Sequence, residues 1–166
     1  DNASPDTVLN RFEKLTPAVQ SSYYGQQLRK RIELIRSLQP GQPAPDFTVT
    51  TFDGEEMSLK DFSGKLLLIY HWSFCPGSIQ LSPQIGEIYK TYAGDQFAVL
   101  GITPLNREMI REAIDETADN EKIFDGTLVK PVYEVMLNHP WPDAHRTTGN
   151  NKQLIRNYGI GGYPYW

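Results

Sequence analysis

The chain contains a single cysteine, Cys75, within the segment HWSFCPGSIQLSP that runs from His71 to Pro83. A strongly apolar segment precedes it and a segment with helical spacing follows, so we expect Cys75 at the carboxyl end of a strand and the first turn of a helix. Unsatisfied backbone N–H groups and the positive end of a helix dipole favour thiolate over thiol there. A lone cysteine is also commonly an inert part of a core, and these residues alone leave both interpretations open.

The histidines do not form a recognised catalytic or metal-binding pattern. The three histidines, at positions 71, 139 and 145, lack the spacing of a recognised metal site, so we expect neither a metal nor another cofactor. His71 precedes Cys75 by four residues in the predicted strand, and strand alternation favours a packed or hydrogen-bonded ring over a base for the thiol. His139 and His145 flank a Trp-Pro turn, and we predict both at the surface. One cysteine cannot form an internal disulfide.

The composition of the 166-residue chain is that of an ordinary globular protein, with 39% hydrophobic and 22% charged residues. Its formal net charge is −4, and its basic residues gather mainly on one predicted helix face, at Arg29, Lys30, Arg31 and Arg36. This is not a phosphate-binding track, so we expect no nucleic acid partner. No apolar run approaches the roughly 18 residues of a membrane helix. The chain begins without methionine, from which we expect that an upstream segment was removed.

The elements that must position Cys75 follow from the apolar pattern. Helical spacing predicts an N-terminal helical extension over residues 1–38. The segment QPGQPAPDF, residues 39–47, carries three prolines and is typical of a stiff connector, so we place a domain boundary near residue 40 and a second domain over 39–166. An Asp53-Gly54 pair between two short strand-like segments predicts a β-hairpin at the start of that domain.

Two continuous apolar segments, residues 65–71 and 97–103, predict central strands that are covered on both faces. Helical spacing between them, over residues 76–92, predicts a right-handed crossover between parallel strands. The remaining predicted elements are a helix over 106–120 capped by Asn106, a helix over 130–137, a strand over 141–144, and a helix over 152–158 ending at Gly159. The order of elements predicts an α/β domain.

The segment LLLIYHWSFCPGS resembles the active-site strand and turn of thioredoxin-fold thiol-disulfide oxidoreductases, whose signature is Trp-Cys-x-x-Cys. Aligned on the cysteine, Phe74 takes the tryptophan position and Ser78 takes the second cysteine. Pro83 lies where family members carry a proline that bends this helix. The segment GYP, residues 162–164, resembles the cis-proline loop that faces the cysteine, and a cis bond before Pro164 is accessible because X-Pro bonds prefer trans only weakly.

The resemblance extends beyond the motif. Residues 41–69 are similar to the opening hairpin of the TlpA- and ResA-like branch, also grouped with AhpC/TSA-type proteins, and residues 12–35 resemble helical linkers of Bacteroides-type envelope proteins. The implied fold is thioredoxin-like, a central mixed sheet flanked by helices, with a helical N-terminal extension. The branch is exported, which implies a periplasmic or cell-envelope location.

Three features depart from the family pattern. Ser78 removes the resolving thiol, so a two-cysteine cycle cannot run within this chain. Ile69 or Tyr70 stands where many members place a buried acid that helps to move protons. The family continues after its cis-proline with two strands and a helix, whereas this sequence ends at Trp166, so we expect C-terminal strands to be missing, because the sheet would otherwise keep an open apolar edge.

The resemblance implies an enzyme that exchanges thiols and disulfides through Cys75, with a protein disulfide or thiol as partner and an external thiol to resolve the mixed disulfide. Ser78 would donate a hydrogen bond to the thiolate, and Pro164 would complete the catalytic group. The residues expected to bind substrate are Trp72, Phe74, Pro76, Gly77 and Tyr163, with the aromatic ones forming an apolar lip.

Three alternatives stay open. The fold could serve as a redox-inactive binding module that pairs with an extended partner through the cis-proline loop. A peroxiredoxin-type peroxidase is disfavoured, because the Thr and Pro that such enzymes place three and seven residues before the cysteine are Trp72 and Leu68 here. An engineered Cys-to-Ser change at position 78 is also open, although Ile79 and Gln80, which differ from the usual residues after the motif, favour a natural serine.

Overall fold

The computed structural model describes residues 4–116, 123–124 and 127–162, with side chains described outside 116–130. The chain divides into two compact units, one made of Asp1–Asp46 with Arg156–Gly159 and the other of Phe47–Ile155 with Ile160–Trp166. The predicted division into domains 1–38 and 39–166 stays a prediction. Each unit is described by itself.

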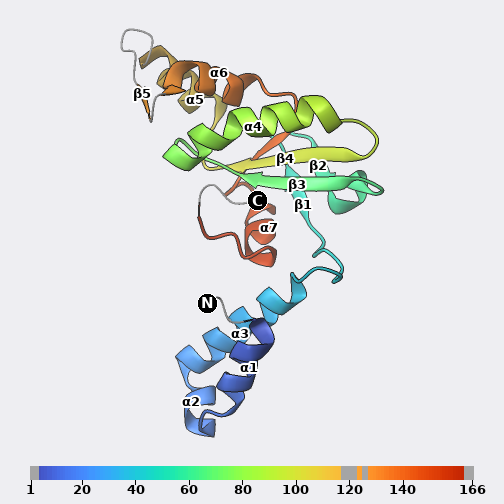
Figure 1. Ribbon diagram of the computed structural model, residues 1–166, viewed down its shortest axis with the longest axis vertical. Coiled ribbons are helices and arrows are strands. Elements are labelled where there is room, and N and C mark those ends of the chain that lie inside the picture. Colours follow the sequence, from blue (N-terminus) through green and yellow to red (C-terminus); the bar gives the residue numbers. More distant parts are fainter. Residues whose placement is uncertain (1–3, 117–122, 125–126, 163–166) are drawn as a thin grey trace. The chain divides into compact units, whose positions relative to one another are not determined.

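The first unit is helical, as the apolar spacing predicts. Helices α1 (Pro5–Glu13), α2 (Pro17–Ser21) and α3 (Tyr23–Ser37) follow one another with short connections (Figure 1). The side chains of Ser4 and Ser22 cap α1 and α3 by accepting hydrogen bonds from backbone N–H groups. Phe12 and Ile32, each 2% exposed, form the centre of the unit, and the guanidinium of Arg29 lies over the Phe12 ring.

The second unit begins with the predicted hairpin. Strands β1 (Thr48–Thr50) and β2 (Glu56–Ser58) pair antiparallel, and Gly54 in the turn adopts a φ of +81° that glycine tolerates without strain. A short 3-10 helix, Leu59–Phe62, leads from the hairpin toward the central sheet. The hairpin is confirmed.

The central sheet has the order β3-β4-β7, in which β3 (Leu66–His71), β4 (Phe97–Thr103) and β7 (Asp143–His145) are all parallel. A single antiparallel bridge between Thr51 and Ala144 continues the pairing from β7 into the hairpin. The described strands of this sheet are parallel, and the strands predicted over residues 65–71 and 97–103 are confirmed. The predicted strand over 141–144 is displaced by about two residues, because Pro142 has no N–H to donate to a neighbouring strand.

Helix α4 (Pro76–Tyr92) makes the crossover from β3 to β4. It lies on the same face of the sheet as α5 (Arg107–Glu116) and α6 (Val129–Asn138), as Figure 1 shows. The oxygen of the Asn106 side chain accepts a hydrogen bond from the Met109 N–H, which confirms the predicted cap of α5. Two two-residue strands, β5 (Ile123–Phe124) and β6 (Thr127–Leu128), pair before α6, and α7 (Asn151–Asn157) ends just before Gly159, whose φ is +63°.

Candidate functional site

Cys75 lies where the sequence predicts it. Strand β3 ends at His71, and Cys75 is the N-cap residue of α4, directly before Pro76. Its side chain makes no capping hydrogen bond to the backbone of the first turn, and it is partly exposed to solvent. The sulfur therefore lies near the positive end of a 17-residue helix without being used to cap it.

Ser78 supplies the polar contact to this sulfur. Its side chain is completely buried, and its Oγ lies 3.2 Å from the Cys75 Sγ. The same Oγ accepts a hydrogen bond from the backbone N–H of Ser73, also at 3.2 Å. Since the Ser73 N–H can only donate, the proton of the hydroxyl group remains free to point at the sulfur. The turn thus provides a hydrogen-bond donor for a thiolate at position 75.

Tyr70 occupies one of the two positions at which the family pattern suggests a buried acid. It is 1% exposed, and its hydroxyl group lies 3.0 Å from the Ser82 Oγ and donates to the Ser78 carbonyl oxygen at 3.4 Å. Burial raises the pKa of Tyr70, and its hydrogen bonds with Ser82 and Ser78 oppose this only in part. Tyr70 is therefore a neutral phenol that fixes the first turns of α4 and not an acid that exchanges protons near neutral pH.

His71 is packed and hydrogen-bonded, as expected. Its ring is fully buried, and its Nδ1 lies 2.8 Å from the carbonyl oxygen of Gly162. Because a carbonyl oxygen only accepts, Nδ1 carries the proton. Burial lowers the pKa of His71 to about 4, although the bond to Gly162 acts in the opposite direction. This bond ties the end of β3 to the first residue of the GYP segment, whose Tyr163 and Pro164 lie outside the described residues.

The structure separates the residues that we expected to bind substrate. Phe74 is half-buried and packs against Tyr133 of α6, with ring centroids 4.5 Å apart, while Pro76 is exposed and Gly77 is half-buried. These three residues adjoin Cys75 at the surface. The expectation that Trp72 lines an apolar lip is wrong, because Trp72 is 1% exposed and belongs to the hydrophobic core.

A buried polar cluster near the turn escapes sequence analysis. The indole N–H of Trp72 donates to Asp143 Oδ1 at 3.0 Å, and the other carboxylate oxygen lies 2.8 Å from Nε2 of His139. The side chains of Asp143 and His139 are only 6% and 7% exposed, so the prediction of His139 at the surface is wrong. The ring is buried because it stacks on Trp141, with centroids 4.2 Å apart. No local sequence signal marks these contacts, since Trp72 and Asp143 are 71 residues apart.

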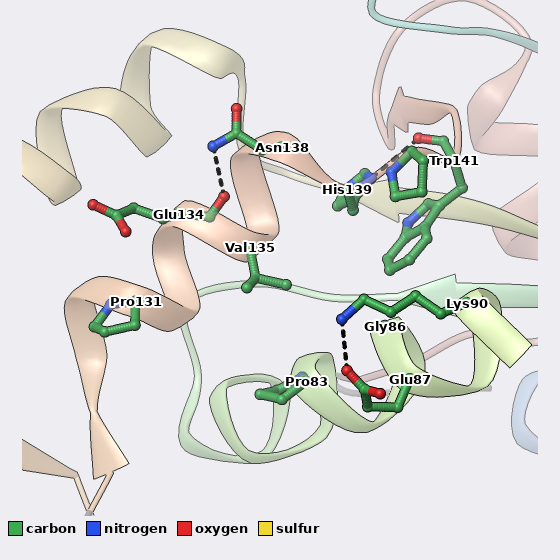
Figure 2. Close-up of a pocket in the computed structure, with 11 residues that line it drawn as sticks. Pro83, Gly86, Glu87, Lys90, Pro131, Glu134, Val135, Asn138, His139 and Trp141 are labelled. Carbon is green, nitrogen blue, oxygen red and sulfur yellow. Dashed lines mark hydrogen bonds and ion pairs between the residues drawn. The ribbon is translucent and has the colours of Figure 1, made fainter.

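A cavity of about 590 Å³ lies between α4 and α6 (Figure 2). Pro83, Gly86, Val135 and Trp141 contribute apolar surface, and Cys75 is not among the lining residues. Lys90 is paired with Glu87 at its edge, and the Asn138 amide donates to the backbone of α6. The cavity is separate from the cysteine site.

The described part of the chain holds no group of three or more His, Cys, Asp or Glu residues arranged to bind a metal ion. None of its described helices is both long and apolar enough to cross a membrane.

The central sheet, the crossover helix α4 and the cysteine in the turn before it define a thioredoxin-like α/β domain. Solved structures agree: a thiol:disulfide interchange protein from Bacteroides sp. superimposes with a TM-score of 0.54 and 23% identity, over 77% of this chain and 72% of that one. The thioredoxin domain of a Bacteroides vulgatus thiol-disulfide oxidoreductase gives a TM-score of 0.50 and 22% identity, over 77% and 79%. At these identities, the likeness concerns the fold.

The chain belongs to the AhpC/TSA family, whose pattern matches residues 40–162. It is 35% identical to the thioredoxin-like protein YneN of Bacillus subtilis, over 49% of this chain and 48% of that protein. It is 36% identical to the thiol-disulfide oxidoreductase ResA of Bacillus thuringiensis, over 31% of each chain. A relative with a peroxiredoxin name, bcp of Helicobacter pylori, is 28% identical over 52% of this chain and 58% of its own length. The matches thus span about a third to somewhat over half of these relatives.

Proposed function

We propose that the protein is a thiol-disulfide oxidoreductase that acts through Cys75 alone. One observation carries the proposal: the Ser78 hydroxyl group, held by the Ser73 N–H, lies 3.2 Å from the Cys75 sulfur at the start of α4. A donor and a helix N-terminus both stabilise negative charge, and the thiolate is the form of cysteine that attacks disulfides. Partial exposure of Cys75 leaves the sulfur accessible to a partner.

The reaction is a pair of exchanges. The Cys75 thiolate attacks one sulfur of a partner disulfide, the partner's S–S bond breaks, and the other sulfur leaves as a thiolate while a mixed disulfide forms. Ser78 has no sulfur, so a thiolate from outside the chain attacks the mixed disulfide and restores Cys75 as a thiolate. The net result moves a disulfide between thiols and leaves the oxidation state of the protein unchanged, which suits isomerisation or transfer of disulfides.

The partners follow from this scheme. We propose a protein disulfide or thiol as substrate, and an external thiol for resolution. Phe74, Pro76 and Gly77 adjoin Cys75 and offer the surface against which the partner chain lies, and we assign the same role to Tyr163 and Pro164 from the resemblance of the GYP segment. Disulfide chemistry persists in oxidising compartments, so we also propose a periplasmic or cell-envelope location.

The two rival functions, a peroxidase and a binding module, make different demands on the residues around Cys75. A peroxiredoxin-type site needs a small polar group beside the cysteine, whereas Trp72 is buried and its indole is engaged by Asp143. A redox-inactive binding module would need no reactive thiol, and the polar contact to Cys75 would then have no consequence for reactivity.

The test uses the fact that the chain has one cysteine, so any thiol signal comes from Cys75. The rate of alkylation by iodoacetamide is measured against pH for the folded protein and for the same chain unfolded in urea. We expect the folded protein to reach half of its maximal rate at a lower pH than the unfolded chain. Equal curves, or no reaction until unfolding, would contradict the proposal and leave a binding module.

A second variant tests the one-cysteine cycle. Ser78→Cys restores the two-cysteine spacing, so mixed disulfides with a cysteine-containing model peptide should resolve without added thiol, whereas the mixed disulfide of the wild-type protein should persist until thiol is added. Gly77→Cys places the second thiol one residue off register and is the matched control. Spontaneous release of the peptide from the wild-type protein would contradict the proposal.

A further inference from the structure

Asp143 has both carboxylate oxygens engaged in the interior. Oδ1 accepts the indole N–H of Trp72 at 3.0 Å, and Oδ2 lies 2.8 Å from Nε2 of His139, which makes no hydrogen bond to another group among the described residues. Nδ1 of His139 lies 3.1 Å from the Trp141 carbonyl oxygen and, because a carbonyl oxygen only accepts, carries a proton. This cluster joins three elements: the end of β3, the end of α6 and the start of β7.

The backbone around this carboxylate is built to admit it. Gly101 of β4 pairs with Asp143 of β7, and a side chain at position 101 would collide with Asp143 Oδ1 and press against the Trp72 ring nitrogen. The carbonyl oxygen of Asp143 accepts the Phe52 N–H at 2.7 Å, which fixes the residue from the hairpin side. Glycine at position 101 therefore has a specific purpose, which is to leave space for the contact between Asp143 and Trp72.

The contact between Asp143 and Trp72 is connected to the cysteine turn through the backbone of Trp72 and Ser73. The backbone N–H of Trp72 donates to the Ile102 carbonyl oxygen at 3.0 Å, which holds this residue against β4. The next residue, Ser73, uses its N–H to hold the Ser78 hydroxyl group that faces the Cys75 sulfur. The backbone of Trp72 therefore connects the contact with Asp143 to the Ser73 N–H, and a shift of this backbone would change the direction in which the Ser73 N–H points.

We propose that Asp143 and Trp72 are positioning residues for Cys75: the hydrogen bond between them fixes the backbone at Ser73 and thereby the Ser78 donor. This inference rests on the proposed function. Stability alone does not account for the cluster, because well-packed apolar residues are often as stabilising as a buried ion pair. A directional bond from a carboxylate to an indole, in contrast, fixes one orientation of the tryptophan.

The test is a double-mutant cycle read out as the rate of Cys75 exchange with a small disulfide, at a pH where all variants are folded. Asp143→Ala and Trp72→Phe each remove the bond from one side, and we expect each to lower the rate about tenfold. The double variant should be no slower than the slower single variant, because both changes remove the same link. Asp143→Asn keeps an oxygen that can accept the indole N–H, so its rate should stay within about twofold of wild type.

Two further measurements separate positioning from general damage. The indole N–H of Trp72, assigned in the NMR spectrum by its loss in Trp72→Phe, should shift in Asp143→Ala and remain close to its wild-type position in Asp143→Asn. The amide proton of Ser73 should exchange with solvent faster in Asp143→Ala than in wild type. Asp53→Asn removes an exposed carboxylate that pairs with Arg107 and is the control that should change neither the rate nor the spectrum around Trp72.

The outcomes distinguish the inference from the proposed function. If wild-type Cys75 exchanges no faster than the unfolded chain, the proposed function fails, while the Ser73 amide still reports whether Asp143 orders the turn. If Asp143→Ala moves the indole signal but leaves Ser73 exchange and the Cys75 rate unchanged, the inference is overturned. Additive losses in the double variant, or an Asp143→Asn variant as slow as Asp143→Ala, would also overturn it.

Discussion

The two polar regions near the end of β3 are built in opposite ways. The cysteine turn draws Ser73, Cys75 and Ser78 from six consecutive residues, and its sulfur is partly exposed. The buried cluster draws Trp72, His139 and Asp143 from three separate elements, and each side chain is at most 7% exposed. The sulfur of the first region is accessible to a partner, whereas the side chains of the second are held in the interior by a hydrogen bond, an ion pair and a ring stack.

This contrast indicates a division of tasks. A reactive thiol has to meet a partner and therefore lies at the surface, where few contacts define its orientation. The buried cluster adjoins the turn through Trp72, and its hydrogen bond and ion pair fix the orientation of side chains that lie in the interior. Changes in the cluster should thus affect stability strongly, and changes in the turn should affect reactivity with little cost in stability.

The largest expected effect comes from breaking the buried pair. His139→Ala leaves Oδ2 of the buried Asp143 carboxylate without a partner while Trp72 still donates to Oδ1, and this should lower the free energy of unfolding by about 3–5 kcal/mol. Urea unfolding followed by fluorescence measures the change. His145→Ala is the matched control, because that ring is half-buried and contacts the Pro104 carbonyl oxygen and the backbone N–H and hydroxyl group of Thr147, so its loss should cost about 1 kcal/mol. Equal losses would show that the carboxylate is not dependent on its partner.

The next prediction concerns the pH dependence of stability that results from His71, the last residue of β3. Burial lowers the pKa of His71 to about 4 from 6.5, so between these values the unfolded chain binds a proton that the folded protein does not. Stability should therefore be complete above pH 6.5 and fall as the pH decreases toward 4, by about 3 kcal/mol at most. His71→Asn keeps a donor toward the Gly162 carbonyl oxygen and cannot titrate, so it should lose this part of the acid sensitivity. Identical slopes of unfolding free energy against pH in both proteins would contradict the assignment.

A smaller loss of stability is expected when the space beside the Asp143 carboxylate is filled. Gly101→Ala introduces a methyl group where Asp143 Oδ1 and the Trp72 ring nitrogen lie, and the resulting shift should cost about 1–3 kcal/mol. Gly86→Ala is the control, because this glycine lies within α4 and has open space around it, so alanine should be neutral or slightly stabilising. Thermal unfolding of wild type and both variants measures the change in stability. A neutral Gly101→Ala would mean that Asp143 moves aside without loss.

The sequence predicts the elements well where the signal is local. Continuous apolar segments identify β3 and β4, the Asp53-Gly54 pair identifies the hairpin, and Asn106 identifies the start of α5. The same local pattern predicts that Cys75 lies at the junction of a strand and a helix. It also predicts that Cys75 lies near Ser78, because residues three positions apart at the start of a helix are about one turn apart.

The sequence fails where contacts are long-range. Trp72 next to the cysteine suggested a surface for a partner, and its burial depends on Asp143 of β7, which no pattern near residue 72 reveals. His139 follows a helix and precedes a proline, which is typical of a surface turn, and only the stacking of its ring on Trp141 and its pairing with Asp143 make it buried. These residues become meaningful only when the parallel register of β4 and β7 is known.

The smallest expected effect lies in the turn itself and concerns reactivity. Ser78→Ala removes the hydroxyl group that faces the Cys75 sulfur, and loss of one hydrogen bond to a charged sulfur should slow disulfide exchange by about tenfold. The fold should tolerate the change, because alanine is a good helix former and the side chain has similar volume. Ser82→Ala is the matched control: Ser82 is buried on the same helix and contacts Tyr70, not Cys75, so its loss should leave the exchange rate unchanged. An equal slowing in both variants would attribute the effect to the packing of α4, whereas a selective slowing in Ser78→Ala would show that the hydroxyl group at position 78 promotes the reaction of Cys75.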